Sequence, residues 1–409
     1  MSGDVHGAAD APSRSRGAAT GEVAAAFAKL GLISFGGPIA HLGYFHTEFV
    51  DRRRWLSEEE YADLVALCQF LPGPASSQFV FALGLQRAGL TGAVLSSLAF
   101  LTPSAVLLIL FAYGVSGAGN LAQAGWVHGL KLAAVAVVAH AVWGMWGKLC
   151  PDWPRVAICL LAAAAVLLVP NAWAQVAVIV ASAILGWVLF RRAVHLPRPG
   201  AHEGVRGHAP AIASLLLFGL LLLAAPAAAR ATGSQSLAVF DAFYRSGSLV
   251  FGGGHVILPL LRSEVVPPGW VSDDAFLAGY GAAQAIPGPL FTFAGYLGAV
   301  IYAGPNAWLS GAWCLLAIFL PSCLLVGGVL PYWHQLRSMP WAQAGLRGAG
   351  AGVVGILLAA LYTPVFTEGV RDARDLAVAL LALGLLKVVK APPVVVVALC
   401  AAAGQWLLR

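Results

Sequence analysis

The chain has 409 residues, of which 59% are hydrophobic and only 10% charged, and its mean hydropathy is +0.81. Soluble domains carry roughly 25% charged residues, so this composition excludes a soluble globular protein and indicates an integral membrane protein. The net charge of +6 would suit a nucleic-acid partner, but the basic residues form no stripe with aromatics and lie mostly in loops, so we expect a lipid bilayer and no nucleic acid.

In chain order, residues 1–21 come first, and they are polar and rich in Gly, Ala and Ser. They lack the apolar core of a cleavable signal, so we expect a disordered tail. Apolar runs of about the 17–25 residues that span a bilayer follow at 91–115, 126–149, 172–190, 211–229, 306–330 and 345–366, with shorter runs at 154–169, 373–390 and 393–408. No ten-residue alternating segments typical of a β-barrel occur. The predicted fold class is an all-α polytopic membrane protein.

The chain contains one unit written twice. Phe35-Gly36-Gly37-Pro38 and Pro72-Gly73-Pro74 recur as Phe251-Gly252-Gly253-Gly254 and Pro287-Gly288-Pro289. A shift of 216 pairs Lys29 with Arg245 and Glu48 with Glu264, and a shift of 215 pairs Gln69 with Gln284. This period far exceeds the 20–50 residues of solenoid repeats. We therefore predict two domains of one fold, 22–190 and 211–409, joined by an arginine-rich cytoplasmic linker at 191–210.

The motifs separate segments that are too short to cross a bilayer alone, namely 22–34, 39–50, 61–71 and 75–86. Proline cannot donate a backbone hydrogen bond, and glycine permits positive φ, so both interrupt a helix. Short, interrupted segments at matching places in two halves indicate the broken or re-entrant helices of a transporter's binding site. The alternative is a packing kink at a helix crossing, but four breaks in two matched pairs favour the binding site.

Charge bias indicates that the two repeats are inverted. The loop at Arg52-Arg53-Arg54 is basic, whereas the equivalent loop at 265–269 contains no Lys or Arg. Basic loops favour the cytoplasm. Five apolar segments separate residue 55 from residue 270, and an odd number of crossings places the two loops on opposite sides.

The interrupted helices suit an anion, because helix N-termini present free N–H groups and a positive dipole end. We expect the hydroxyl and amide donors Ser76, Ser77, Gln78 and Gln69 to bind it, with Thr292 and Gln284 in the second copy. The motif residues themselves complete the candidate site: Phe35, Gly36, Gly37, Pro38, Pro72, Gly73, Pro74, Gly252, Gly253, Pro287, Gly288 and Pro289. Lys29 and Arg245 would supply compensating charge, because a cation within a bilayer usually lines a cavity or pairs.

Snorkelling to the interface is the alternative for those two cations, and it fits Lys131 and Arg347, near helix ends, better. Glu48 and Glu264 are candidate proton carriers, since low dielectric raises a carboxyl pKa. For Glu48 we favour pairing with the nearby arginines. His41 and His255, each within five residues of a Phe-Gly-Gly, are further coupling candidates or else hydrogen-bonded pocket residues.

The sequence does not favour an enzyme. It contains no HExxH, GxSxG or Walker motif and no GxGxxG in a βαβ context, so we expect no catalytic residues, metal or cofactor. An intramembrane reductase would need a nucleophile and base or a metal set facing one cavity, and only scattered histidines are present.

Two stretches carry a family resemblance: residues 29–45, around Phe35-Gly36-Gly37-Pro38, and the specific run Gln69-Phe-Leu-Pro-Gly-Pro-Ala-Ser-Ser-Gln78. They closely resemble the chromate transporter family in its two-domain, long-chain form, over residues 22–408. The resemblance implies chromate export across a bacterial plasma membrane, driven by the membrane potential or a proton gradient and conferring chromate resistance. Import or exchange of sulfate or another inorganic anion on the same scaffold is the alternative.

The second copy departs from the first where it has Gly254 for Pro38 and Leu290-Phe291-Thr292 for Ala75-Ser76-Ser77. The first half is therefore expected to supply more ligand contacts. The oligomeric state stays open, a homodimer included.

Overall fold

The computed structural model describes residues 16–35, 37–117, 124–169, 172–191, 208–251 and 254–406. Every regular element within these ranges is a helix. Five stretches are long and apolar enough to cross a membrane: Ala75–Val115, Gly125–Leu149, His208–Thr232, Ala307–Tyr332 and Pro340–Gly369. The predicted class, an all-α multi-pass membrane protein, is confirmed.

The first half runs from α1 to α7. Its elements are α1 (Arg16–Ile33), α2 (Gly37–His46), the π-helical η1 (Thr47–Arg52), α3 (Glu58–Phe70), α4 (Ala75–Gly117), α5 (Gly125–Leu149), α6 (Trp153–Leu168) and α7 (Ala172–Phe190). Helix α4 is interrupted, because Ala88 and Gly89 leave helical φ/ψ. It therefore consists of a short segment after the first Pro-Gly-Pro and a long one after Gly89.

The second half repeats this order after α8 (His208–Thr232). Its elements are α9 (Gln235–Leu249), η3 (Gly254–Val256), α10 (Ile257–Val265), α11 (Asp273–Ala283), η4 (Leu290–Thr292), α12 (Phe293–Ile301), α13 (Ala307–Val329), η5 (Leu330–Tyr332), α14 (Trp333–Arg337), α15 (Pro340–Ala360), η6 (Leu361–Phe366), α16 (Thr367–Gly369), α17 (Ala373–Gly384), η7 (Leu385–Val389) and α18 (Pro393–Trp406). Helices α9, α11 and α13 match α1, α3 and the long part of α4, so α8 stands between the copies.

The helix starts show why the sequence folds alike in both halves. Ser57 accepts a hydrogen bond from the backbone N–H of Glu60, whose side chain accepts from the N–H of Ser57, which forms a capping box at α3. Ser272 caps α11 at the matching place by accepting from the N–H of Ala275. Such caps satisfy N–H groups that a helix start leaves unpaired, so the broken segments begin at defined residues.

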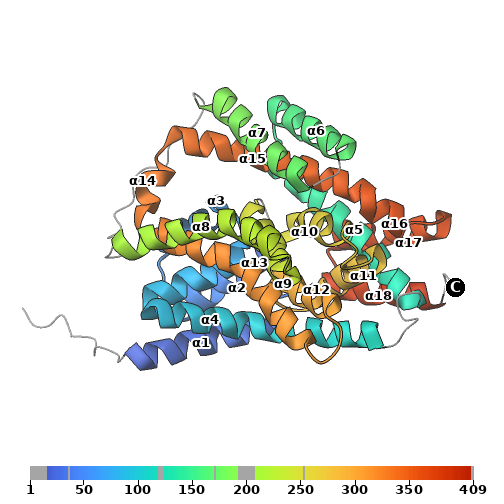
Figure 1. The fold of residues 1–409 in the computed structure, drawn as a ribbon, viewed down its shortest axis with the longest axis horizontal. Coiled ribbons are helices and arrows are strands. Elements are labelled where there is room, and N and C mark those ends of the chain that lie inside the picture. The colour runs from blue at the N-terminus through green and yellow to red at the C-terminus, as the bar shows by residue number, and fades with distance from the viewer. Residues whose placement is uncertain are drawn as a thin grey trace, which may run out of the picture.

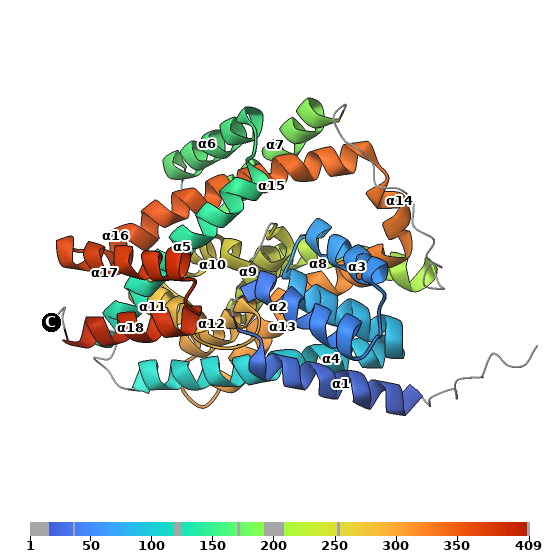
Figure 2. The same ribbon diagram turned by 180° about the vertical axis from the view of Figure 1, so that it is seen from behind.

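The two halves exchange packing partners. Helix α15 of the second half packs against α6 and α7 of the first, and α5 of the first half packs against α17 and α18 of the second (Figure 1). Figure 2 shows the same arrangement from behind. Small residues allow the close approach: a Cβ on Gly129 would lie 2.0 Å from the carbonyl oxygen of Cys400, and one on Gly348 would lie 2.1 Å from that of Ser182. Neither half is complete alone.

Aromatic side chains brace the broken segments from within. In the first half Phe27, Phe45, Phe79 and Phe100 are fully buried, and the rings of Phe45 and Phe79 stack with centroids 5.2 Å apart. These rings come from α1, α2 and both parts of α4. Each ring pair contributes about 0.5–1.5 kcal/mol beyond area burial, so the aromatic cluster holds the interrupted helices in position.

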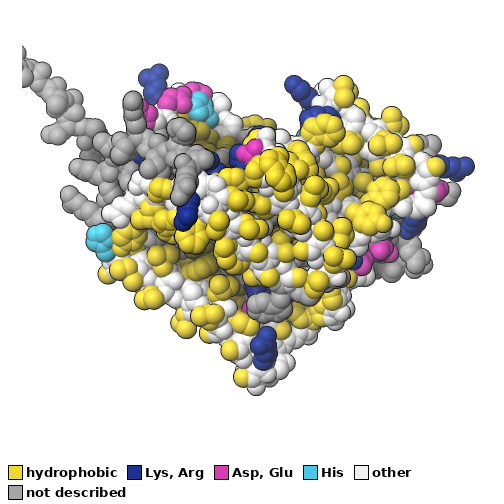
Figure 3. All heavy atoms as spheres, turned by 90° about the horizontal axis from the view of Figure 1, so that it is seen from above, with side chains coloured by type: hydrophobic (Ala, Val, Ile, Leu, Met, Phe, Trp, Pro, Cys, Tyr) yellow, Lys and Arg dark blue, Asp and Glu magenta, His cyan; other side chains and the backbone are white. Residues whose placement is uncertain are grey.

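The outer surface is apolar. Figure 3 shows one face of the molecule on which hydrophobic side chains cover most of the area and charged side chains lie mostly toward the rim. On α8, Leu216, Leu220 and Leu223 are 69%, 62% and 75% exposed. Residues at this spacing share one helix face, which suits contact with lipid.

Two boundaries differ from the sequence expectation. Helix α1 begins at Arg16, within the range expected as a disordered tail, and α8 begins at His208, within the expected linker. Residues 1–15 and 192–207 lie outside the described residues. Arg16–Gly21 is polar by composition, but it continues the helix that Val23 and Phe27 anchor in the core.

Inverted topology remains a prediction with a direct test. Three long apolar stretches separate residue 55 from residue 270, and the shorter apolar helices α6 and α7 also lie between them. The number of crossings is odd when both or neither of these two helices spans the bilayer, and that is the arrangement we predict. Single cysteines at Glu59→Cys and Pro268→Cys in a cysteine-free variant should therefore react with a membrane-impermeant maleimide from opposite sides of oriented vesicles.

Permeabilised vesicles, in which both cysteines should label, serve as the control. Labelling of both sites from one side of sealed vesicles would contradict the inverted arrangement.

Candidate functional site

All four predicted helix breaks are present. Helix α1 ends at Ile33 before α2 begins at Gly37, and α3 ends at Phe70 before α4 begins at Ala75. In the second half, α9 ends at Leu249 before η3, and α11 ends at Ala283 before η4. Gly36, Gly252 and Gly253 lie outside the described residues, as does the side chain of Pro38. The breaks are where the halves meet.

Each Pro-Gly-Pro turn hydrogen-bonds to the Phe-Gly-Gly break of the other half. The N–H of Gly73 donates to the carbonyl oxygen of Val250 over 2.6 Å, and the N–H of Gly288 donates to that of Ser34 over 2.8 Å. Val250 matches Ser34 and Gly288 matches Gly73 in the repeat. We call Gly73 with Val250 the first turn pair and Gly288 with Ser34 the second. This reciprocity is the mark of an approximate two-fold relation between the halves.

Glycine is required at both turns. Gly73 has φ +125° and Gly288 has φ +104°, conformations that L side chains rarely adopt. A Cβ on Gly73 would lie 2.1 Å from Oγ of Ser322, and one on Gly288 would lie 2.7 Å from Oγ of Ser104. Ser104 and Ser322 follow the prolines Pro103 and Pro321 at matching places in α4 and α13. The turns therefore pack directly against the other half.

Buried polar atoms without a partner surround the first turn pair. Ser76, Ser77 and Gln78 are 1%, 7% and 1% exposed. Within the described chain, the Oγ atoms of Ser76, Ser77 and Ser322 and Oε1 of Gln78 have no hydrogen-bond partner, whereas Nε2 of Gln78 donates to the carbonyl oxygen of Pro72 over 2.6 Å. A buried polar group without a partner costs about 1–3 kcal/mol, and such groups are rare outside functional sites.

The Pro-Gly-Pro turn of the second half is not followed by such donors. Phe291 and Phe293 stand where the first half has Ser76 and Gln78. The hydroxyl of Thr292 donates to the carbonyl oxygen of Pro289 over 2.7 Å, so its hydrogen is already used. The site is therefore chemically asymmetric although its backbone is nearly symmetric.

His41 lies at the second turn pair. Its Nε2 is 3.0 Å from the carbonyl oxygen of Ser34, which also accepts from Gly288. A carbonyl oxygen only accepts, so Nε2 carries the hydrogen and Nδ1 is the acceptor of a neutral ring. Nδ1 of His41 and Oγ of Ser34 are buried without a partner in the described chain. Sequence reasoning missed Ser34, whose signal was a polar residue directly before Phe-Gly-Gly.

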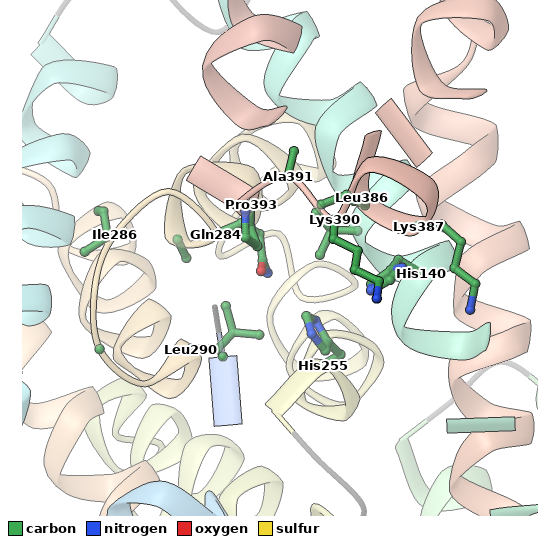
Figure 4. A pocket seen from close by; sticks show the side chains of 14 residues that line it. His140, His255, Gln284, Ile286, Leu290, Leu386, Lys387, Lys390, Ala391 and Pro393 are labelled. Atoms are coloured by element: carbon green, nitrogen blue, oxygen red, sulfur yellow. The ribbon is translucent and has the colours of Figure 1, made fainter. Parts of the chain in front are cut away.

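A cavity of about 460 Å³ opens beside the second turn pair. Gly37 and Gly288 line it together with side chains shown in Figure 4, including Gln284, His140, His255, Lys387 and Lys390. Nδ1 of His255 lies 2.8 Å from the hydroxyl of Tyr280. Sequence reasoning missed the two lysines, although the run Lys387-Val-Val-Lys390 stands out in an apolar stretch.

The two matched glutamines differ in their surroundings. Gln284 is half-buried at the cavity and its Nε2 has no partner in the described chain. Gln69 is exposed on α3. Of the two matched glutamines, Gln284 lies in the wall of this cavity and Gln69 does not.

The matched cations form matched ion pairs. Nζ of Lys29 lies 3.3 Å from Glu48, which also pairs with Arg52 at 3.0 Å and with Arg53 at 2.7 Å. Arg245 pairs with Glu264 at 2.7 Å and with Asp241 at 2.8 Å. The pairing expected for Glu48 is confirmed. Charge compensation by Lys29 and Arg245, and proton coupling through Glu48, Glu264, His41 and His255, stay predictions.

Lys131 corrects the snorkelling expectation. Its side chain is 1% exposed and forms an ion pair with Asp274 at the start of α11. The pair joins α5 of the first half to α11 of the second, because the exchange of packing partners buries this part of α5. Arg347, its match in the second half, is half-buried on α15.

An exposed polar cluster lies at the end of α2, away from the breaks. Nε2 of His46 is 3.0 Å from Glu58, and its Nδ1 is 3.5 Å from Asp51. The hydrogen bond with Glu58 is the main cause that raises the pKa of His46 above its ordinary value. The cluster forms surface ion pairs, which contribute little to stability.

Broken helices in two matched halves, with buried donors where the halves meet, define a membrane transport protein of the internal-repeat type. The chain belongs to the chromate transporter family, whose sequence pattern matches residues 21–187 and 237–405. These two segments are the two copies of the repeat, and α8 falls between them.

The relatives are similar along most of their length. A probable chromate transport protein of Synechococcus elongatus is 29% identical, over 93% of this chain and 94% of the relative. Chromate transport proteins of Pseudomonas aeruginosa and Cupriavidus metallidurans are 28% and 27% identical, over 81% and 87% of this chain and 78% and 84% of the relatives. No solved structure matches the chain.

The turn geometry predicts that Gly73→Ala and Gly288→Ala each destabilise the protein. The backbone conformation alone costs an L residue about 1–3 kcal/mol, and the new Cβ also collides with a serine of the other half. Both variants should unfold at lower temperature in detergent.

Gly43→Ala is the matched control, because a Cβ on Gly43 of α2 would meet nothing within 4 Å and alanine favours a helix. The constraint would be absent if Gly73→Ala and Gly43→Ala unfolded at the same temperature.

Proposed function

We propose that the protein exports chromate across the plasma membrane of a bacterium, driven by the membrane potential or a proton gradient, and thereby confers chromate resistance. Membership of the chromate transporter family supports transport, and the names of the relatives favour chromate as the substrate. The single observation that carries the proposal is the set of buried, unpartnered hydroxyl and amide groups at the first turn pair.

These groups suit a tetrahedral oxyanion. Such an ion accepts hydrogen bonds at four oxygens, and hydroxyls rotate to donate. Ser76 and Ser77 lie in the first turn of the short segment of α4, where backbone N–H groups lack intrahelical partners and the helix dipole favours negative charge. A dianion bound there receives donors from side chains and backbone together.

The membrane potential favours export. Moving one charge through 100 mV is worth about 2.3 kcal/mol, hence about 4.6 kcal/mol for a dianion that leaves a negative cytoplasm. Import would have to overcome the same energy with coupled cations. The candidate coupling groups are His41, His255, Glu48 and Glu264, of which Glu48 is already held by three cations.

The two-fold relation supports alternating access. In internal-repeat transporters a site between the halves opens to one side and then the other as one half rocks against its partner. Here the two turn pairs join the halves at their breaks. Oxyanion bound between the turns would be exposed on opposite sides as the halves move.

Proteoliposomes test the function directly. Radiolabelled chromate should move through the wild-type protein when a potassium diffusion potential, negative on the side of origin, is imposed, and it should stay hexavalent. Uptake of sulfate against that potential, with no chromate flux, would instead favour the anion importer. Conversion to reduced chromium would point to an enzyme.

A variant pair tests the donors at the first turn pair. Ser76→Ala combined with Ser77→Ala removes two unpartnered hydroxyls, and we expect chromate transport to fall roughly tenfold or more, since each lost ligand contact costs about 1–3 kcal/mol. Thr292→Val should depress it less, because that hydroxyl bonds to its own turn.

Initial flux rates at matched protein density provide the measurement. Equal losses, or a larger loss from Thr292→Val, would show that the ligand does not bind nearer the first turn pair.

A further inference from the structure

The cavity beside the second turn pair is electropositive. It is lined by two lysines, Lys387 and Lys390, and two histidines, His140 and His255, and none of the described residues in its wall is acidic. Within the described chain no carboxylate lies within 4 Å of either lysine, whereas Lys29 and Lys131 each have one such partner and Arg245 has two. The cavity therefore keeps its positive charge available for a ligand.

The fold holds both lysines at this place. Lys390 ends η7 in a left-handed conformation, φ 57°, and the N–H of Ala391 donates to the carbonyl oxygen of Leu385 over 3.0 Å. Leu386, directly before Lys387, is buried in one cluster with Val396, Val397 and Cys400 of α18. Nζ of Lys387 also lies 5.0 Å from the centre of the Trp143 ring. Figure 4 shows Lys390 beside His140 and across from His255.

The same cavity reaches the meeting point of the halves. Gly37 and Gly288 form part of its wall, and Gly288 is the donor of the second turn pair. Gln284 contributes an amide nitrogen that has no partner in the described chain. Donors thus continue from the exposed lysines inward to the breaks.

The repeat alignment gives Lys387 no basic counterpart. The capping residues Asp152 and Asp372 align α6 with α17 at a shift of 220, which places Leu167 opposite Lys387. The groove between α7 and α15, lined by Phe70, Phe251 and Trp341 among others, is almost wholly apolar. A basic cavity suits an anion that enters or leaves there.

We propose that this cavity is a binding station for a free tetrahedral dianion, in which Lys387 and Lys390 hold the ion before or after it reaches the turn pairs. Its volume of about 460 Å³ accommodates such an ion with water, which occupies about 30 Å³ per molecule. The identity of the transported ion rests on the proposed function, but binding at the lysines is testable without transport. A lipid phosphate offers the same chemistry, and the polar wall at Gln284 favours the free ion.

Equilibrium binding of radiolabelled inorganic sulfate tests the station. The full chain is placed in nanodiscs of phosphatidylcholine, so that no anionic lipid competes. Lys387→Gln with Lys390→Gln should weaken sulfate binding at least about tenfold, the loss expected for charge-assisted contacts. Lys148→Gln is the control, because it removes an exposed charge outside the cavity, at the end of the helix α5 that also carries His140. This variant should bind sulfate like the wild type.

Lys387→Arg with Lys390→Arg should retain most of the binding, which separates charge from folding, and melting temperatures without sulfate should match. If the double glutamine variant cannot be purified, Lys387→Gln alone decides the question in the same way. Unchanged sulfate affinity in the glutamine variants would overturn the station. The station would also be overturned if the glutamine variants lost bound phosphatidylglycerol, measured by native mass spectrometry in mixed-lipid nanodiscs, while their sulfate binding stayed intact.

Flux measurements separate this inference from the proposed function. Lysine-dependent sulfate binding by a wild-type protein that moves no chromate would keep the station and refute chromate transport. Normal chromate flux together with normal sulfate binding in the glutamine variants would keep chromate transport and refute the station.

Discussion

The arrangement of this protein depends on one backbone contact made twice. The glycine of each Pro-Gly-Pro turn donates its N–H to the break of the opposite half, at 2.6 and 2.8 Å. Inside an apolar protein such a donor has no water to turn to, so each turn needs the other half. The glycines, the facing serines Ser104 and Ser322, and the caps at Ser57 and Ser272 all serve to place these two contacts.

A symmetric backbone with asymmetric side chains gives the protein a direction. The first turn pair carries hydroxyls and an amide, and the second opens to a basic cavity, whereas the groove between α7 and α15 is apolar. Two conformations related by exchanging the roles of the halves would be close in backbone energy. Side chains would then decide from which side an anion binds more tightly.

Much of the fold could be predicted from the sequence, because it rests on local chemistry. Proline and glycine interrupt helices wherever they occur, so all four breaks were predicted. Ser57 and its match Ser272 fall at helix starts for equally local reasons. The pairing of Glu48 with the arginines that follow it was likewise predicted from nearby residues, whereas Lys29 and Arg245 were expected to compensate an anion and not to pair with Glu48 and Glu264.

What could not be predicted depends on contacts between distant segments. Lys387 and Lys390 line the same cavity as Gly37 because α17 and α18 pack against α5. No sequence pattern near Lys387 predicts that packing. Lys131 was expected to snorkel because its partner, Asp274, lies in the other half. The reciprocal hydrogen bonds are formed by backbone atoms, which leave no trace in residue type except the glycines themselves.

The exchange of packing partners has a consequence for biosynthesis. Helices α6 and α7 leave the ribosome long before α15, the helix that packs against both of them. Until it is made, the ridge around Gly186, where α15 will approach within contact of the backbone, faces lipid or a membrane chaperone. The first half must therefore wait in the bilayer as an incomplete domain, and a chain that stalls between residues 190 and 340 exposes a surface ready to pair with α15 of a neighbouring molecule.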